Sequence, residues 1–211
     1  MTNFKAASLA ILIVLGACAS YPETAFSPQS DGLWVEGVID DTTFDSLQQG
    51  LRNNPHLDTL ILQNVPGSAD DEQSLTKLSR YIRGRGLTTR VPSDGVVASG
   101  GTDMVLMGAT RIIEPGACIG VHTWAAGGLF GFEAGSDLPR SDPAHQLYLT
   151  FYQEMGIPEA FYWYTLAAAG PDDVHWMSPE EINRFGLSTT PVPNSLNETV
   201  SQRRARCEQR V

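Results

Sequence analysis

The stretch "GVVASGGTDMVLMGATRIIEPGACIGVHTW", residues 95–124, contains the pattern that decides the fold. A short apolar run, residues 96–98, ends at Ser99 and two glycines, and a small-residue segment typical of a helix follows. Two more strand-like runs come next, and the second ends at His122. A serine between a strand and a helix, with a histidine at the end of a later strand, suggests a nucleophile and its base. A tight turn that merely needs small residues is the alternative.

Strand and helix patterns alternate on both sides of this stretch. The predicted strands are residues 33–39, 58–64, 87–92, 96–98, 110–115 and 118–122, and the predicted helices are 42–55, 68–86 and 102–109. Ser68 is the expected cap of the second helix, and Leu75, Leu78 and Ile82 are its expected buried face. This order predicts an α/β fold, with parallel strands and helices that cover the sheet.

The second half of the chain has a different character. A glycine-rich segment, residues 125–142, is predicted to be a long loop, a lid or a substrate groove beside His122. Two helices rich in aromatic residues are predicted at 143–156 and 158–170, with the rings in the core or at a subunit interface. Ser178 and Glu181 form the pattern of a capping box, and a strand-like run at 187–192 is the last expected element.

The N-terminus has the pattern of an export signal. It contains one lysine and an apolar run of residues 6–17, which is shorter than the about 20 residues of a transmembrane helix. Leu15, Gly16 and Ala17 before Cys18 resemble a bacterial lipobox. We therefore expect a signal peptide over 1–17, a lipidated Cys18 that anchors the protein to a membrane in the periplasm, and a linker over 18–31. An ordinary signal peptide or an N-terminal anchor helix is the alternative.

The remaining chain, about 180 residues, is long enough for one domain with its own core. We place this domain at 32–193 and a polar C-terminal tail at 194–211. The formal net charge of -10 argues against nucleic acid or anionic lipid surfaces as partners. With Cys18 lipidated, Cys118 and Cys207 remain as a disulfide in an oxidising compartment or as two free thiols.

Acyl transfer by serine requires a base, an orienting group and N–H donors for the oxyanion. Ser99 stands at a predicted helix N-terminus, the N–H of Gly100 is sterically open, and His122 is the available base. The N–H groups of Gly67 and Ser68, in the Pro-Gly turn after the second strand, are candidates for a further donor, and an ordinary structural turn is the alternative. The Gly-x-Ser-x-Gly elbow of α/β hydrolases is absent, because Val97 occupies its first position.

Three motifs in register resemble the ClpP/crotonase superfamily, in particular the Clp protease proteolytic subunit. They are "NVPGS" (64–68), the stretch from residue 96 to 124, and "MSPEEINRFGL" (177–187), and the resemblance runs from about residue 33 to 188. It implies a ClpP/crotonase-like spiral of ββα units with helices covering a mostly parallel sheet. It also implies Ser99 as nucleophile, His122 as general base, Gly67 and Gly100 as oxyanion donors, and a homo-oligomer.

The chain departs from this superfamily at three places. Ser68 replaces the second glycine of the oxyanion turn, which requires that residue 68 has no positive φ. The position of the acid falls on Val174 in an ungapped alignment, so that Asp173 is the favoured acid and Asp172 the second choice. A loop cap is the alternative role of these two aspartates. Lys77 lies on a predicted solvated helix face and is not expected to act as a base.

Three functions remain after these observations. The first is an exported serine peptidase that cleaves peptides or unfolded segments without an ATPase partner. The second is a ClpP-like fold that has lost turnover and acts as a binding or assembly module at the cell envelope. An acyl-CoA enzyme is disfavoured, since its cofactor is cytoplasmic and no basic site for its phosphates is visible. No cofactor is expected, and the spacing of the histidines and cysteines argues against a metal site.

Overall fold

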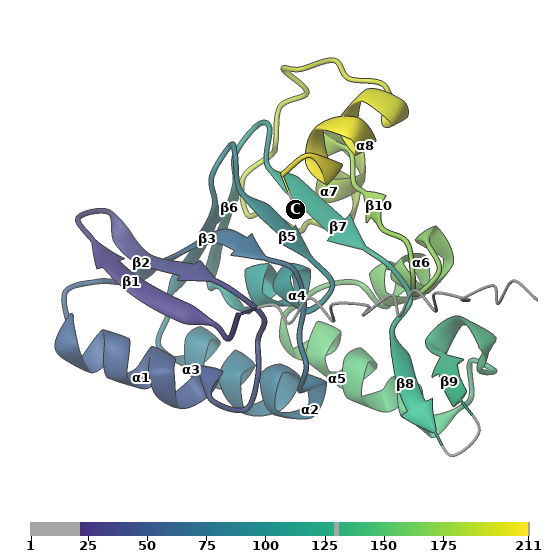
Figure 1. Ribbon diagram of the computed structural model, residues 1–211, viewed down its shortest axis with the longest axis horizontal. Helices are drawn as coiled ribbons and strands as arrows, with labels where there is room; N and C mark the ends of the chain where they lie inside the picture. Colours follow the sequence, from purple (N-terminus) through teal and green to yellow (C-terminus); the bar gives the residue numbers. More distant parts are fainter. Residues whose placement is uncertain (1–21, 129–130, 211) are drawn as a thin grey trace, which may run out of the picture.

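The structure, a computed structural model, describes residues 22–128 and 131–210 (Figure 1). Its strands are β1 (Ala25–Gln29), β2 (Gly32–Glu36), β3 (Thr59–Val65), β4 (Thr88–Val91), β5 (Val96–Ala98), β6 (Thr110–Ile113), β7 (Cys118–Val121), β8 (Ala125–Gly128), β9 (Gly131–Ala134) and β10 (His175–Trp176). Its α-helices are α1 (Thr43–Asn53), α2 (Asp71–Gln73), α3 (Ser79–Gly84), α4 (Gly100–Met107), α5 (Gln146–Glu154), α6 (Glu159–Ala168), α7 (Pro179–Phe185) and α8 (Val200–Glu208). A π-helical turn joins α2 to α3 as η1 (Ser74–Leu78), and two 3-10 turns precede α5 as η2 (Gly135–Asp137) and η3 (Pro143–His145).

The main sheet of 8 strands winds as a spiral because β3 pairs with two different strands on one side. The first residues of β3 pair with β4, and its last residues pair with β5. The pairs from β2 to β7 are all parallel, whereas β1 and β10 are antiparallel to β2 and β7. The predicted α/β fold, with a spiral of ββα units and a mostly parallel sheet, is confirmed.

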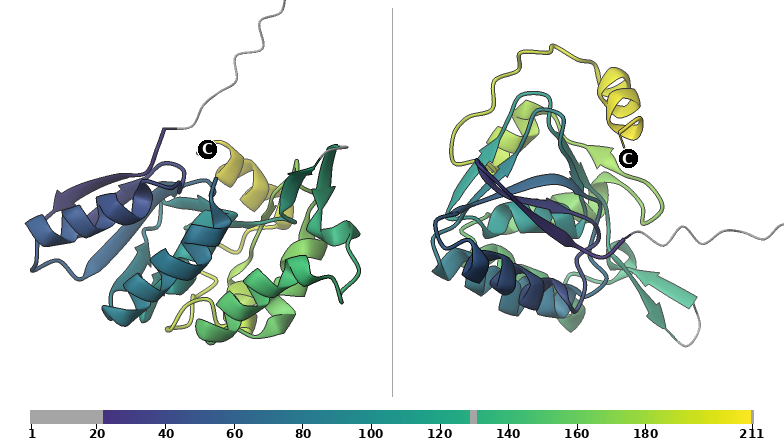
Figure 2. Two further views of the ribbon diagram at one scale, coloured as in Figure 1. Left: turned by 90° about the horizontal axis from the view of Figure 1, so that it is seen from below. Right: turned by 60° about the vertical axis from the view of Figure 1, so that its left-hand side comes forward.

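The helices lie in layers that differ in burial. Helices α1, α3 and α5 cover one side of the sheet, and α8 lies on the opposite side (Figures 1 and 2). Helix α4 packs on β3, β4, β5 and β7, and every one of its residues is buried. The predicted buried face of the second helix is confirmed, since Leu75, Leu78 and Ile82 are at most 2% exposed. The cap of this helix is Asp70 instead of Ser68, because the Asp70 carboxylate accepts from the Gln73 N–H.

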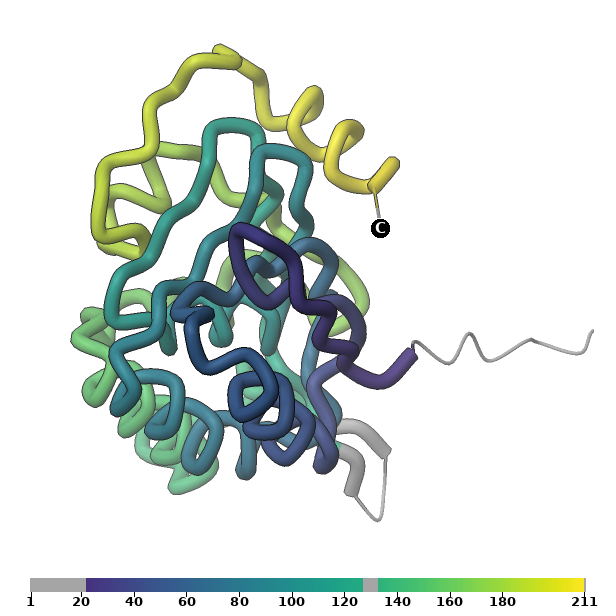
Figure 3. The backbone as a smooth tube through the Cα atoms, turned by 90° about the vertical axis from the view of Figure 1, so that its left-hand side faces the viewer, coloured from purple at the N-terminus to yellow at the C-terminus, as the bar shows by residue number. Residues whose placement is uncertain are grey.

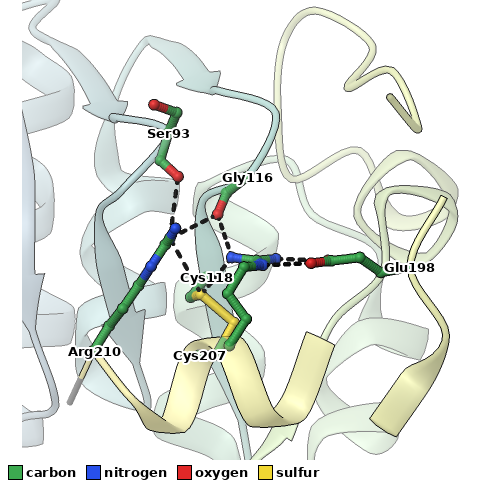
Figure 4. Close-up of a disulfide and its surroundings, with 7 residues drawn as sticks. Ser93, Gly116, Cys118, Glu198, Cys207 and Arg210 are labelled. Carbon is green, nitrogen blue, oxygen red and sulfur yellow. Dashed lines mark hydrogen bonds and ion pairs between the residues drawn. A yellow bond between two sulfur atoms is a disulfide. The ribbon is translucent and has the colours of Figure 1, made fainter. Parts of the chain in front are cut away.

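The C-terminal segment is a docked helix, so the prediction of a polar tail over 194–211 is wrong (Figure 3). A disulfide between Cys118 in β7 and Cys207 in α8 holds it, which confirms the disulfide and excludes two free thiols. Arg206 donates to Gly116 O at 2.6 Å and pairs with Glu198 at 2.6 Å (Figure 4). The polar side chains of α8 are thus tied to the sheet beside a buried sulfur bridge.

The predicted linker over 18–31 is also wrong in its second half. Residues 25–29 form β1, which pairs antiparallel with β2, and the Thr24 hydroxyl donates to Val38 O at 2.6 Å. The segment is short and mostly exposed, and its pairing with β2 makes it the edge strand of the sheet. The predicted signal peptide and Cys18 lie outside the described residues. In residues 22–128 and 131–210, no helix combines the length and apolar character needed to cross a bilayer.

Two other predictions for the second half need correction. The glycine-rich segment 125–142 is not all loop, since β8 and β9 form an antiparallel hairpin directly after Trp124. Residues 187–192 form no strand, because Pro191 has no N–H for a ladder. Among the described residues, one backbone–backbone hydrogen bond, from Thr189 N to Arg111 O, joins this segment to β6, and the other bonds to Arg111 involve side chains. The capping box of Ser178 and Glu181 at the start of α7 is confirmed.

Candidate active site

Ser99 stands at a sharp turn between β5 and α4. Its φ of 54° and ψ of -127° are outside the regions that residues with a side chain normally occupy. Such a conformation costs on the order of 1–3 kcal/mol and persists only where its surroundings enforce it. Here Ser99 N donates to Gly120 O at 3.1 Å, and the N–H groups of Thr102 and Asp103 donate to Ser99 O. The turn therefore holds the Ser99 side chain at the N-terminus of a buried helix.

The glycines after Ser99 are required by close packing. A Cβ atom on Gly101 would lie 1.8 Å from Val65 O, and one on Gly100 would lie 2.4 Å from the Ser68 Cβ. The end of β3 and the turn after it thus lie against the start of α4. The small residues are thus needed for a tight turn, and that turn presents Ser99; its role as a nucleophile stays a prediction.

His122 directly follows β7, and its tautomer is fixed by the backbone. Its Nδ1 lies 2.7 Å from the carbonyl oxygen of Thr123, and a carbonyl oxygen only accepts. Nδ1 therefore carries the proton, and Nε2 has a lone pair that is free to take a proton. The Thr123 N–H donates to Ala169 O at 3.0 Å, which holds this peptide in place.

Ser99 and His122 line one cavity of about 30 Å³, enough for a water molecule. In the part of the chain that the structure describes, no hydrogen bond joins their side chains. Hydrogen bonds between catalytic groups are often long before a substrate binds, so the missing hydrogen bond is compatible with Ser99 and His122 acting together. The structure brings the predicted nucleophile and base to the same cavity.

The predicted oxyanion donors lie beside Ser99. A Cβ atom on Gly67 would be 3.8 Å from the Ser99 Cβ. Ile39 N donates to Gly67 O and Ala69 N donates to Ile39 O, which fixes the turn around Ser68. Gly100 is the first residue of α4, where N–H groups have no intrahelical acceptor. Ser68 is not among the residues with positive φ, so it replaces glycine without backbone strain.

The two candidate acids lie away from this cavity. Asp173 pairs with Arg204 of α8 at 2.8 Å, and its side chain is 52% exposed. The hydrogen bond from Arg204 holds the pKa of Asp173 below its usual value. Asp172 is exposed, and neither aspartate lines the cavity of Ser99 and His122. The structure therefore does not bring the predicted acid to the predicted base.

Two other aspartates, Asp71 and Asp103, line the cavity, and the sequence analysis missed both. Asp103 lies one turn after Ser99 in α4 and is 9% exposed. The Tyr152 hydroxyl donates to its Oδ1 at 2.8 Å. Burial raises the pKa of Asp103 to about 7, although the Tyr152 hydrogen bond lowers it. A carboxylate within an apolar helical pattern was the available signal in the sequence.

Aromatic side chains form the opposite wall of the cavity. Tyr148 stacks between Trp124 and Tyr162 and donates to Asp71 Oδ2 at 2.6 Å. Trp124 Nε1 donates to the Tyr162 hydroxyl, and the buried His145 contacts the same hydroxyl through Nδ1. The aromatic cluster thus belongs to the core, as predicted, but Tyr162 also faces the cavity. Among the described residues, no group of His, Cys, Asp and Glu side chains is arranged to hold a metal ion.

An apolar groove of about 300 Å³ is lined in part by the turn of residues 66–68. Its lining includes Gly67 from this turn, Ala98 from the strand that ends at Ser99, and Trp176 from β10. Because Gly67 and Ala98 adjoin Ser99, an apolar side chain in the groove would lie close to the serine.

Comparisons with known proteins show similarity in structure alone. No protein-family profile and no curated protein matches the sequence. The 1510-N membrane-bound stomatin-specific protease is 15% identical, with a TM-score of 0.52 over 78% of this chain and 79% of that chain. A second structure of that protease, with a substrate peptide, is 16% identical, with a TM-score of 0.49 over 82% and 81% of the two chains.

A third similar structure is the human enoyl Coenzyme A hydratase domain-containing protein 3. It is 11% identical, with a TM-score of 0.47 over 88% of this chain and 76% of that chain. At these identities the comparisons bear on the fold alone, and the first has a TM-score above 0.5. The chain has the ClpP/crotonase-like fold.

Proposed function

We propose that this chain is a serine hydrolase that cleaves peptides. The observation that carries the proposal is the Ser99 turn: a strained serine at a helix N-terminus faces the same cavity as a histidine whose Nε2 is free. The protease among the similar structures supports peptides over other acyl compounds, because it shows that this fold is used for peptide cleavage.

In the proposed reaction, Ser99 Oγ attacks the peptide carbonyl carbon, and His122 Nε2 accepts the hydroxyl proton. The negative charge on the carbonyl oxygen is stabilised by the N–H groups of Gly67 and Gly100. The C–N bond then breaks, and the imidazolium returns the proton to the leaving amine. Water hydrolyses the acyl-enzyme by the same steps and restores Ser99.

The groove beside the oxyanion turn favours a substrate with an apolar side chain next to the cleaved bond. The groove is lined by Val38, Val96 and Trp176 among others, and its volume exceeds that of one large side chain. Ser99 would thus cleave peptides with apolar residues in preference to charged ones.

Labelling with a fluorophosphonate probe tests the proposal on the purified domain. We expect the wild type to be labelled, and Ser99→Ala and His122→Ala to lose labelling while keeping their melting temperatures. An exposed serine, Ser141→Ala, is the matched control and should be labelled like the wild type. A folded wild type that is not labelled would contradict the proposal and favour a binding module, which the small cavity and the distant Asp173 would then explain.

We also propose that the chain is a lipoprotein anchored in the periplasm through Cys18. The disulfide between Cys118 and Cys207 supports export, because such bonds persist in oxidising compartments. Metabolic labelling with a fatty-acid analogue tests this proposal. Label should appear on the wild type and disappear in Cys18→Ser, and label on neither would contradict it.

A further inference from the structure

Asp103 is the buried carboxylate nearest in the chain to the proposed nucleophile. It follows Ser99 by one helical turn, and its N–H donates to Ser99 O at 3.2 Å. Its side chain lines the cavity that Ser99 and His122 also line. The turn that strains Ser99 thus also sets the position of this carboxylate.

The charge of Asp103 has no positive partner at this cavity. Tyr152 donates to Oδ1, and within the described residues no hydrogen bond reaches Oδ2. The lining includes no lysine or arginine, and the one side chain in it that can become positive is His122. A carboxylate that is buried without a positive partner is costly to ionise, and groups of this kind cluster at functional sites.

The imidazole of His122, in turn, lacks the carboxylate that a serine triad provides. Its Nδ1 donates to the carbonyl oxygen of Thr123, a neutral acceptor. This bond fixes the tautomer, but it supplies no full negative charge when the ring becomes positive. Asp173, the acid expected from the sequence, is paired with Arg204.

We propose that Asp103 takes over the electrostatic role of the triad acid and stabilises the His122 imidazolium from the wall of the cavity. This inference rests on the proposed hydrolase function. In the proposed arrangement, two groups share the tasks of a triad acid. The Thr123 carbonyl oxygen orients the His122 ring, and the Asp103 carboxylate stabilises the positive charge of that ring. Asp103 is therefore a positioning residue, since it acts through His122 and touches no reacting atom.

The groups around Asp103 determine when its charge is present. Tyr148 and Tyr152 face it from α5, Tyr162 from α6, and Asp71 from α2. Burial and the charge of Asp71 raise the pKa of Asp103 to about 7. The carboxylate forms as the pH rises through neutrality, so catalysis should increase over the same range. Asp71→Asn removes the repelling charge and should shift this increase to lower pH.

The test is the titration of the His122 ring by NMR in the whole exported domain. His122→Gln assigns its signal among the 4 histidines. We expect Asp103→Asn to move the midpoint of this titration to lower pH, because the variant removes the negative charge that favours the imidazolium. The matched control is Asp173→Asn, which removes another carboxylate of the chain and should leave the midpoint unchanged.

The rate of fluorophosphonate labelling is the second readout. Asp103→Asn should label about 10-fold more slowly, as a loss of about one pKa unit of charge stabilisation implies. A folded Asp103→Asn with an unchanged His122 midpoint overturns the inference, even if labelling falls. A shifted midpoint in a protein that is never labelled supports the coupling of the two groups and contradicts the hydrolase, so the two failures are distinguishable.

Discussion

The cavity below Ser99 and the surface between β10 and α8 each contain an aspartate, and their surroundings differ in every respect. Asp103 is 9% exposed and faces no lysine or arginine, and burial raises its pKa to about 7. Asp173 is half-exposed, pairs with Arg204 at 2.8 Å and has a lowered pKa through that hydrogen bond.

The difference shows that the fold holds Asp103 in surroundings that disfavour its ionised form, whereas the surroundings of Asp173 favour the ionised form. The ion pair of Asp173 and Arg204 is exposed to solvent, and its two side chains are hydrogen-bonded to each other, as is usual for ion pairs on a protein surface. Asp103 opposes folding at alkaline pH, and groups of this kind cluster at functional sites. Each prediction below removes one part of this contrast.

Asp103→Asn should have the largest effect on stability. The pKa of Asp103 is higher in the folded state (about 7) than the ordinary value of 3.8, so the folded state binds the proton more tightly. The resulting stabilisation is complete below about pH 4 and is lost as the pH rises through about 7. Wild type should thus lose about 4 kcal/mol from this group over that range, whereas the neutral amide loses none.

Urea unfolding at about pH 5 and about pH 8 measures this effect. The stability of Asp103→Asn relative to wild type should be greater at the higher pH, and Asp173→Asn should show no such gain. An equal difference between Asp103→Asn and wild type at both pH values would mean that the buried carboxyl is not ionised in this range.

The disulfide should give the next largest effect, and it acts on the other region. Replacing Cys118 and Cys207 together by serine removes a link across a sequence separation of 89 residues and should cost about 3 kcal/mol. Amide exchange in α8 should rise, while Ser99 should still be labelled, because His122 is held at the opposite end of β7 by Thr123.

Reduction of the wild type is the control for the serine pair. It should lower the melting temperature of the wild type and leave that of the double variant unchanged. We expect the cavity at Ser99 and the region of α8 to be independent. Loss of Ser99 labelling in the folded double variant would show that they are coupled and would contradict this expectation.

The sequence predicts the framework and the turn at Ser99 because their signals are local. A strand end, a glycine pair and a helix start can each be recognised from a few residues, and these local patterns are enough to single out Ser99, Gly100 and His122. The approach of Gly67 follows from parallel pairing of β3 with β5, which the strand and helix order implies.

The acid that we propose was not predictable in this way. Asp103 lies in a mostly apolar helix, and the hydrogen bond to its side chain comes from Tyr152, which is 49 residues further along the chain. Asp173 lies one residue before the position expected for the acid, but Arg204, which pairs with it, lies 31 residues further along in a segment predicted to be a tail. Strand β1 was missed for a similar reason, since its polar residues gain their conformation from β2.

Tyr152→Phe should produce a smaller change within the cavity. Because the Tyr152 hydrogen bond lowers the pKa of Asp103, its loss should raise that pKa further. The folded protein should lose about 2 kcal/mol at alkaline pH and less at acid pH, where the protonated carboxyl needs the bond less. Carbon-13 NMR of the carboxyl groups measures the change directly, and Tyr148→Phe, which removes the donor to Asp71, is the matched control.

Replacing Arg204 by glutamine should have the smallest effect of all. The Asp173 and Arg204 side chains are both about half exposed, so solvent and salt screen their attraction. We expect the pKa of Asp173 to return toward its usual value and the melting temperature to change little, with that change vanishing at high salt.

The exposed pair of Arg80 and Glu154 provides a matched control, and Arg80→Gln should behave like Arg204→Gln. Labelling of Ser99 should be unaffected in both variants and in Asp173→Asn. If Asp173→Asn instead lost labelling as completely as His122→Ala, the surface aspartate would be the acid after all. The Arg204 pair would then have to open for Asp173 to reach His122, and Arg204→Gln would be expected to increase the rate of labelling. An unchanged labelling rate in Arg204→Gln therefore favours Asp103, and an increased rate favours Asp173, however small the effect of the substitution on stability.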